Sequence, residues 1–194
     1  MVKLGFIVEG ATESIVLEHQ AFFHYLESLG VAYVPEVINV EGNGNLLPHN
    51  IDQNTSILIR KGATHIFILT DLDDDLCITS TKDRIAPSSV HIVIIAVRTI
   101  ESWFLADTAA MRLYLNDPSF YCDWPETLAD PFDTIKQLRL AKTGKGFTEK
   151  KRLANTFVHR MGFSIAHAAQ HPNCKSARYF LDKINEIAAA DRPA

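Results

Sequence analysis

The chain has 194 residues, of which 47% are hydrophobic, and this is enough for one α/β domain with an appendage and a sizeable core. The net charge of −4 excludes attraction of nucleic acid by the overall field of the protein, so a polyanionic partner would need a local basic surface or metal ions. Cys77, Cys122 and Cys174 are far apart and odd in number, which argues against a disulfide framework and indicates a reducing compartment. No run of residues suits a signal sequence or a membrane span, so we expect a cytoplasmic protein with no membrane partner.

Up to about residue 115, short β-rich runs alternate with longer amphipathic stretches. This alternation predicts βαβ units and a largely parallel sheet. The predicted strands are Lys3–Val8, Ala32–Val40, His65–Thr70 and Val90–Val97. The predicted helices are Thr12–Leu29, Leu46–Lys61 and Ile100–Leu115, and an acidic loop with room for one short helix spans Asp71–Ser89.

After residue 115 the character of the chain changes, because prolines interrupt it repeatedly and no further β-rich run follows. The predicted helices of this part are Pro131–Leu140, Thr148–Met161, Ser164–Gln170 and Lys175–Ala189. The sequence therefore predicts an α/β core over residues 1–115 and a helical C-terminal extension over residues 116–194 that packs on the core. The core is expected to contain a four-stranded, largely parallel sheet flanked by helices.

Three of the predicted strands lead into carboxylates. Glu9 and Glu13 follow the first strand, Asp71 and Asp73 follow the third, and Glu101 comes shortly after the fourth. The carboxyl ends of parallel strands lie along one edge of a sheet, so we expect these side chains to form one acidic pocket. Carboxylates that close together repel and raise one another's pKa unless a cation lies between them, and a hard divalent metal with oxygen ligands is the simplest stable arrangement.

These residues also have structural interpretations. Glu13 suits the first turn of a helix, where the macrodipole stabilises a carboxylate. The D-x-D pair that begins at Asp71 could belong to an acidic loop with an Asx-turn or a helix cap, and Asp74 and Asp75 fit that interpretation well. Arg98 could pair with a carboxylate or contact a phosphate, and the sequence leaves both roles open.

The extension contains a basic stretch. Between Lys136 and Arg160 there are eight basic residues and one acidic residue, Glu149. A solvated helix face is the usual explanation of such a stretch, but in an otherwise acidic protein it also offers a polyanion a place to bind, and both interpretations stay open. The Thr143–Gly146 segment lacks the P-loop pattern, so the chain carries no ATPase motif of its own.

Three motifs resemble a known family. V-E-G-A-T-E at residues 8–13, D-L-D at residues 71–73 and R-T-I-E-S-W-F-L-A-D at residues 98–107 resemble the TOPRIM fold. More narrowly, they are similar to small stand-alone TOPRIM-like proteins related to RloB and to the nuclease domain of the OLD family. The resemblance implies Mg²⁺ or Mn²⁺ as cofactor and cleavage of phosphodiester bonds, often in defence against phage or foreign DNA and sometimes beside a separate ATPase.

The resemblance also implies roles for individual residues. Glu9 and Glu13 match the first acidic pair of the family, Asp71 and Asp73 match its D-x-D motif, and Glu101 matches a later acidic ligand. A basic residue near the scissile phosphate would be either Lys150 or Lys151, and the sequence does not choose between them.

Together these observations predict a metal-dependent nuclease of the TOPRIM/OLD type. The expected metal ligands are Glu9, Glu13, Asp71, Asp73 and Glu101, and the expected catalytic residues are Glu9, Asp71 and Asp73 with Lys150 or Lys151. We expect nucleic acid as the partner, DNA in preference to RNA, while a separate ATPase and a homodimer stay open. One alternative is a catalytically silent, metal-binding partner subunit of an ATPase-containing complex. A receiver-like phospho-acceptor domain has less support, because it would need a fifth strand carrying a lysine.

Overall fold

The computed structural model describes residues 2–73, 75, 77–85 and 87–191. The strands are β1 (Lys3–Val8), β2 (Ala32–Asn39), β3 (His65–Asp71) and β4 (His91–Ala96). The α-helices are α1 (Ala11–Leu17), α2 (Gln20–Ser28), α3 (Pro48–Arg60), α4 (Ile78–Ile85), α5 (Glu101–Ala106), α6 (Thr108–Leu115), α7 (Pro131–Thr143), α8 (Lys150–Arg160), α9 (Ile165–Gln170) and α10 (Lys175–Ala190). Two short 3₁₀ turns, η1 (Asn43–Asn45) and η2 (Pro125–Thr127), complete the described elements.

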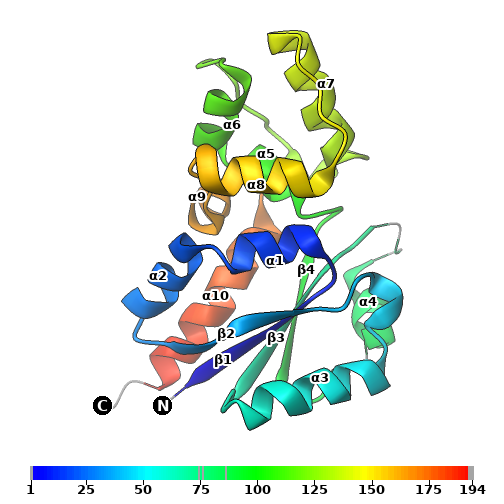
Figure 1. The fold of residues 1–194 in the computed structure, drawn as a ribbon, viewed down its shortest axis with the longest axis vertical. Helices are drawn as coiled ribbons and strands as arrows, with labels where there is room; N and C mark the ends of the chain where they lie inside the picture. The colour runs from blue at the N-terminus through cyan, green and yellow to red at the C-terminus, as the bar shows by residue number, and fades with distance from the viewer. Residues whose placement is uncertain (1, 74, 76, 86, 192–194) are drawn as a thin grey trace.

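The strands form one four-stranded sheet in the order β2-β1-β3-β4, and every neighbouring pair is parallel. The predicted α/β class and its parallel sheet flanked by helices are thereby confirmed (Figure 1). From β1 the chain first moves to β2 on one side and then crosses to β3 on the other side. The connections therefore diverge between β1 and β3, which is the place where parallel α/β sheets open a crevice at their carboxyl edge.

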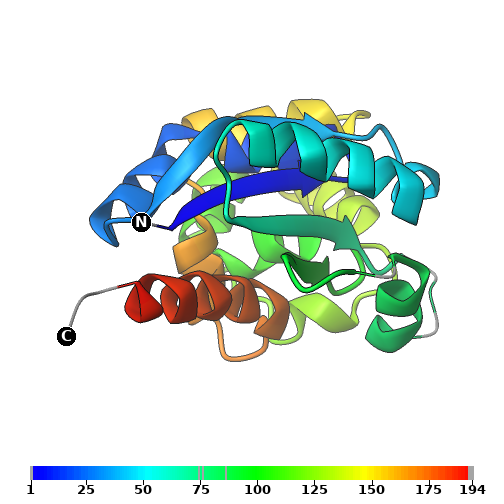
Figure 2. The same cartoon turned by 90° about the horizontal axis from the view of Figure 1, so that it is seen from below.

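Both faces of the sheet are buried, which explains why the strands read as nearly continuous apolar runs. Phe6 and Phe67 point to a large core shared with α1, α2, α5 and α10, whereas Ile7 and Ile68 point to a smaller core under α3 and α4. Alternate residues of a strand face opposite sides, so one apolar run supplies both cores. Figure 2 shows α3 and α10 on different sides of the sheet.

Two helices that the sequence predicted as continuous are each two shorter helices in the structure, so those two predictions were wrong in their bounds. The range Thr12–Leu29 divides at His19, whose extended backbone ends α1 and whose Nδ1 accepts a hydrogen bond from the Ala21 amide at 3.3 Å. The range Ile100–Leu115 divides at Asp107, whose carboxylate accepts from the Ala110 amide at 3.1 Å and so begins α6. In both cases a side chain that accepts a hydrogen bond from the backbone starts a new helix.

The helical extension packs on the α/β part through one continuous hydrophobic core. Phe180 of α10 contacts Phe67 of β3 with ring centroids 5.6 Å apart, and Phe157 of α8 stacks on Phe104 of α5 at 4.8 Å. The division of the chain at residue 115 stays a prediction. Residues 1, 74, 76, 86 and 192–194 of the predicted ranges lie outside the described residues. Within the part of the chain that is described, no helix combines the length and the apolar character needed to cross a membrane.

Asp107 joins the start of α6 to Ser164 of the extension, so its removal should destabilise the fold. Its side chain is buried and accepts hydrogen bonds from the amides of Ala110 and Ser164, the latter at 3.2 Å. We expect Asp107→Ala to lower the free energy of unfolding by about 3 kcal/mol, because a helix cap is lost and buried amides are left unpaired. Urea denaturation followed by circular dichroism measures this change. The control Asp130→Ala removes an exposed cap from α7 and should cost only about 1 kcal/mol; equal losses in the two variants would contradict the assignment.

Candidate active site

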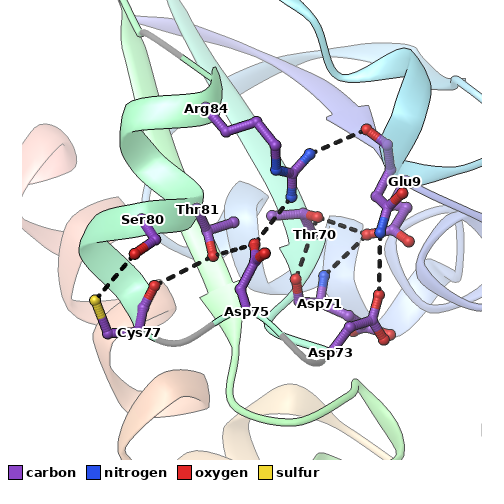
Figure 3. A network of polar contacts seen from close by, with 10 residues as sticks. Glu9, Thr70, Asp71, Asp73, Asp75, Cys77, Ser80, Thr81 and Arg84 are labelled. Atoms are coloured by element: carbon purple, nitrogen blue, oxygen red, sulfur yellow. Dashed lines mark hydrogen bonds and ion pairs between the residues drawn. The ribbon is translucent and has the colours of Figure 1, made fainter.

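The candidate site lies where β1 and β3 end, at the point where the connections diverge. Glu9 directly follows β1, and its backbone amide still donates to Leu69 of β3 at 3.1 Å. Its carboxylate Oε2 accepts from the Thr70 hydroxyl at 2.5 Å and from the Asp71 amide at 3.1 Å (Figure 3). These two hydrogen bonds fix one oxygen of Glu9 across the ends of the two central strands.

Glu13 comes to the same place from the first turn of α1. Its side chain is buried, and α1 begins without a side-chain cap, because the residue before it is Gly10. A Cβ at residue 10 would lie 3.1 Å from Glu13 Oε2, so the glycine leaves room for the carboxylate. The helix start stabilises a negative charge here, but the burial of Glu13 goes beyond what that role alone requires.

Asp71 and Asp73 occupy different positions although only one residue separates them in the sequence. Asp71 is buried at the end of β3, and its Oδ1 accepts from the Ile100 amide at 2.8 Å, next to the start of α5. Asp73 is only half-buried and has the left-handed backbone conformation, with φ of 48°. Its amide donates to the Arg98 carbonyl at 2.9 Å, and its Oδ2 accepts from the Asn43 side chain at 3.3 Å.

Glu101 is the most deeply buried member of the group. It is the first residue of α5, its side chain is 0% exposed, and neither carboxylate oxygen has a hydrogen-bond partner within the described part of the chain. The buried hydroxyls of Thr99 and Ser102 beside it also lack partners. A buried carboxylate without donors is costly, so this arrangement points to a cationic partner.

Lys150 supplies a positive charge at the site from the first residue of α8. Its Nζ lies 3.6 Å from Glu101 Oε2, and it reaches the strand ends although it is far away in the sequence. Burial alone would lower the pKa of Lys150, but the nearby carboxylates, Glu101 first among them, outweigh it and raise the pKa. Lys151 is exposed, and no ion pair joins it to the carboxylates among the residues described. The geometry therefore brings Lys150 to the cluster and leaves Lys151 on the surface.

Burial and mutual repulsion dominate the electrostatics of the cluster, although Lys150 opposes them. Burial, followed by the charges of Glu101 and Glu9, raises the pKa of Glu13 from 4.5 to about 7. Burial and the charge of Glu13 also raise the pKa of Asp71 well above its usual value. The charges of Glu9, Glu101 and Lys150 thus act on both Glu13 and Asp71, whereas Asp73 acts on Lys150.

The residues present suit a hard divalent cation. Several carboxylates offer oxygen ligands. The pKa values of two of them, Glu13 and Asp71, are raised, so a nearby cation would favour their ionised forms. The Glu101 carboxylate has no hydrogen-bond partner among the described residues. However, no group of three His, Cys, Asp or Glu side chains within residues 2–73, 75, 77–85 and 87–191 is already arranged to hold a metal. The cluster therefore offers the donor set for a cation, and its side chains would have to adjust around the ion.

An open cavity of about 520 Å³ adjoins the carboxylates. Asp73, Arg98, Thr99 and Lys150 line it next to the cluster, and the start of α7 at residues 129–132 closes the other side. Arg98 has the left-handed conformation with φ of 64°, an uncommon backbone geometry for a residue other than glycine. Arg98 and Lys150 thus face a space that Asp73, Asp75 and Asp130 also line. The two cations can contact an anion there.

Sequence reasoning missed three residues that hold the site in place. Thr70 donates to Glu9, Asn43 donates to Asp73, and Arg84 of α4 donates to the Asn43 carbonyl at 3.1 Å. Arg84 and Thr81 also hold Asp75, at 3.2 and 2.7 Å (Figure 3). Asn43 follows β2 at the same sheet edge, so it could have been predicted from the fact that the carboxyl ends of parallel strands meet there. Nothing in the sequence pointed to Arg84.

Comparisons with known proteins place this fold beside two solved structures. No family model and no curated protein matches the sequence. The C-terminal region of the Burkholderia pseudomallei OLD protein is similar, with 16% identity and a TM-score of 0.47 over 95% of this chain and 99% of that chain. The C-terminal region of the Xanthomonas campestris pv. campestris OLD protein has 17% identity and a TM-score of 0.38 over 97% of this chain and 96% of that chain.

Both neighbours are C-terminal regions of OLD proteins, which is the group that the sequence motifs resemble.

The raised pKa of Glu13 predicts a pH-dependent stability in metal-free protein. The proton on Glu13 contributes its full stability below about pH 4.5, and this contribution is lost as the pH rises through about 7, because the folded state holds the proton more tightly than the unfolded state. The loss is about 3 kcal/mol. Urea denaturation in EDTA at pH 5 and pH 8 should show a smaller decline for Glu13→Gln than for the wild type. The exposed Glu18→Gln serves as control, and an identical decline in all three proteins would contradict the prediction.

Proposed function

We propose that this chain is a metal-dependent nuclease that cleaves phosphodiester bonds. The observation that carries the proposal is the fully buried Glu101, whose carboxylate has no hydrogen-bond partner among the described residues but has Lys150 at 3.6 Å. A buried carboxylate without hydrogen-bond donors is costly unless cations lie beside it, and one lysine cannot neutralise the whole cluster.

The chemistry of the site follows from the positions of its side chains. Mg²⁺ or Mn²⁺ would be held by Glu9, Glu13, Asp71, Asp73 and Glu101, and when bound would activate water and stabilise charge on the phosphate. Thr70 and the Asp71 amide hold one oxygen of Glu9, and the Ile100 amide holds one oxygen of Asp71, so two of these ligands are oriented in part by the protein itself.

The basic residues of the cavity would bind the substrate. Lys150 and Arg98 both line the space beside the carboxylates and would contact the non-bridging oxygens of the scissile phosphate. Of the two roles that the sequence left open for Arg98, we therefore propose contact with a phosphate and not an ion pair with a carboxylate. We also propose that the substrate is foreign DNA, and this part of the proposal rests only on the resemblance of the three motifs to the TOPRIM/OLD group.

Cleavage should depend on the buried carboxylates. We expect Asp71→Asn and Glu101→Gln each to lower cleavage of plasmid and single-stranded substrates in Mg²⁺ or Mn²⁺ by at least about a thousandfold, because each removes a charge that holds the metal. Unfolding measured in EDTA should be unchanged or shifted to higher denaturant, since a repelling, desolvated charge is gone. The control Asp182→Asn lies exposed on α10 and should cleave normally. Wild-type rates in the two site variants would refute the proposed function.

Metal binding should be linked to the protonation of Glu13. Because the pKa of Glu13 is about 7 without metal, its carboxylate must lose a proton before it can act as a ligand. Calorimetric titration with Mn²⁺ should therefore show tighter binding at pH 8 than at pH 6, with proton release that is detected by changing the buffer. Glu13→Gln should weaken binding and reduce the release of protons. Binding that is independent of pH would argue against a metal at this cluster.

A further inference from the structure

One exposed face of α8 carries a set of polar and basic side chains that the site does not use. We call it the α8 basic face: Arg152, Asn155, Thr156, His159 and Arg160. The spacing of these residues places them on one side of the helix, one turn after another. They line a shallow cavity of about 400 Å³ on the surface.

The opposite side of α8 fixes the orientation of this face. Leu153, Ala154, Phe157 and Val158 are buried, and the helix packs against α1 (Figure 1). The α8 basic face must therefore point to solvent, and its position relative to the carboxylate cluster is set by the core.

The charges of the α8 basic face are not neutralised by the protein. Among the described residues, no ion pair involves Arg152, Arg160 or the adjacent Lys151. The first turn of α8 consists of Lys150, Lys151 and Arg152, although cations at a helix N-terminus oppose the macrodipole. This placement is unfavourable in the free protein, and a polyanion bound along the helix would offset the cost.

We propose that the α8 basic face binds the sugar–phosphate backbone of a nucleic acid and leads it away from the carboxylate cluster. This rests on the proposed function, because Lys150 at the start of α8 is also the lysine beside Glu101. The helix has eleven residues and is about 16 Å long, enough to follow roughly four phosphates of one strand. The contacts are to the backbone, so binding is independent of base sequence.

The test is the salt dependence of binding without cleavage. Wild type and Arg152→Ala/Arg160→Ala are titrated in EDTA with a fluorescent duplex and with a fluorescent single strand, from 50 to 400 mM salt. Loss of two phosphate contacts should weaken binding about ten- to a hundredfold at 100 mM salt. It should also reduce the slope of log K against log salt by about 1.8 for the duplex or 1.4 for the single strand.

The control is Arg60→Ala/Lys61→Ala, which makes the same change in net charge at exposed residues at the end of α3. It should keep the wild-type affinity and slope within twofold, because α3 packs on the opposite face of the sheet from α1 and α8. The control also removes the ion pair of Lys61 with Glu36, which lies outside the α8 basic face. Equal effects of the two double variants, or no binding of either probe by the wild type, would overturn the proposal. Because metal and cleavage are absent from this experiment, a failure here is separate from a failure of Asp71→Asn or Glu101→Gln to abolish cleavage.

Discussion

The arrangement of this protein depends on a group of carboxylates held out of water at the carboxyl edge of the sheet. Glu13, Asp71 and Glu101 are buried there, and burial raises the pKa of the first two. Such a group is unfavourable unless opposing charges approach it. The backbone amide of Ile100 donates a hydrogen bond to Asp71, and the ammonium group of Lys150 lies beside Glu101, so both partly offset the negative charge. Each comes from a segment that the core holds in place.

The helical extension is therefore part of the site and does more than cover the sheet. Lys150 reaches Glu101 only because α8 is anchored, and the anchor is the packing of Phe157 on Phe104 of α5, the same helix that begins with Glu101. A similar link joins the N-terminus of α10 to η2, where Glu126 accepts from the Lys175 and Ser176 amides at 3.0 and 2.8 Å. Contacts distant in sequence thus set the distance between the lysine and the carboxylates. Residues 1–115 alone would form the carboxylate cluster without Lys150.

The sequence was sufficient for the features that depend on local pattern. Apolar runs followed by Glu9 or Asp71 located the strands and the acidic edge, because a parallel sheet gathers all strand ends on one side. It was insufficient wherever a tertiary contact decides the outcome. Asp107 breaks a helix through hydrogen bonds that include one to Ser164, 57 positions away, and periodicity carries no trace of that contact. The choice between Lys150 and Lys151 likewise depends on which way α8 is turned, since adjacent helical residues point about 100° apart.

Net charge also proved a poor guide to what the surface can bind. The chain carries −4 overall, yet five of its 23 Asp and Glu residues gather in one cluster, where the pKa values of Glu13 and Asp71 are raised. The α8 basic face, in contrast, is exposed, and its arginines have no ion pair among the described residues. A polyanion approaching α8 meets the local potential of that helix, because salt at physiological strength screens charges beyond about 8 Å. Binding of divalent cations would further reduce the repulsion between the cluster and a phosphate. The metal and the basic helix would then act together, since each lowers the cost of bringing a polyanion to an acidic protein.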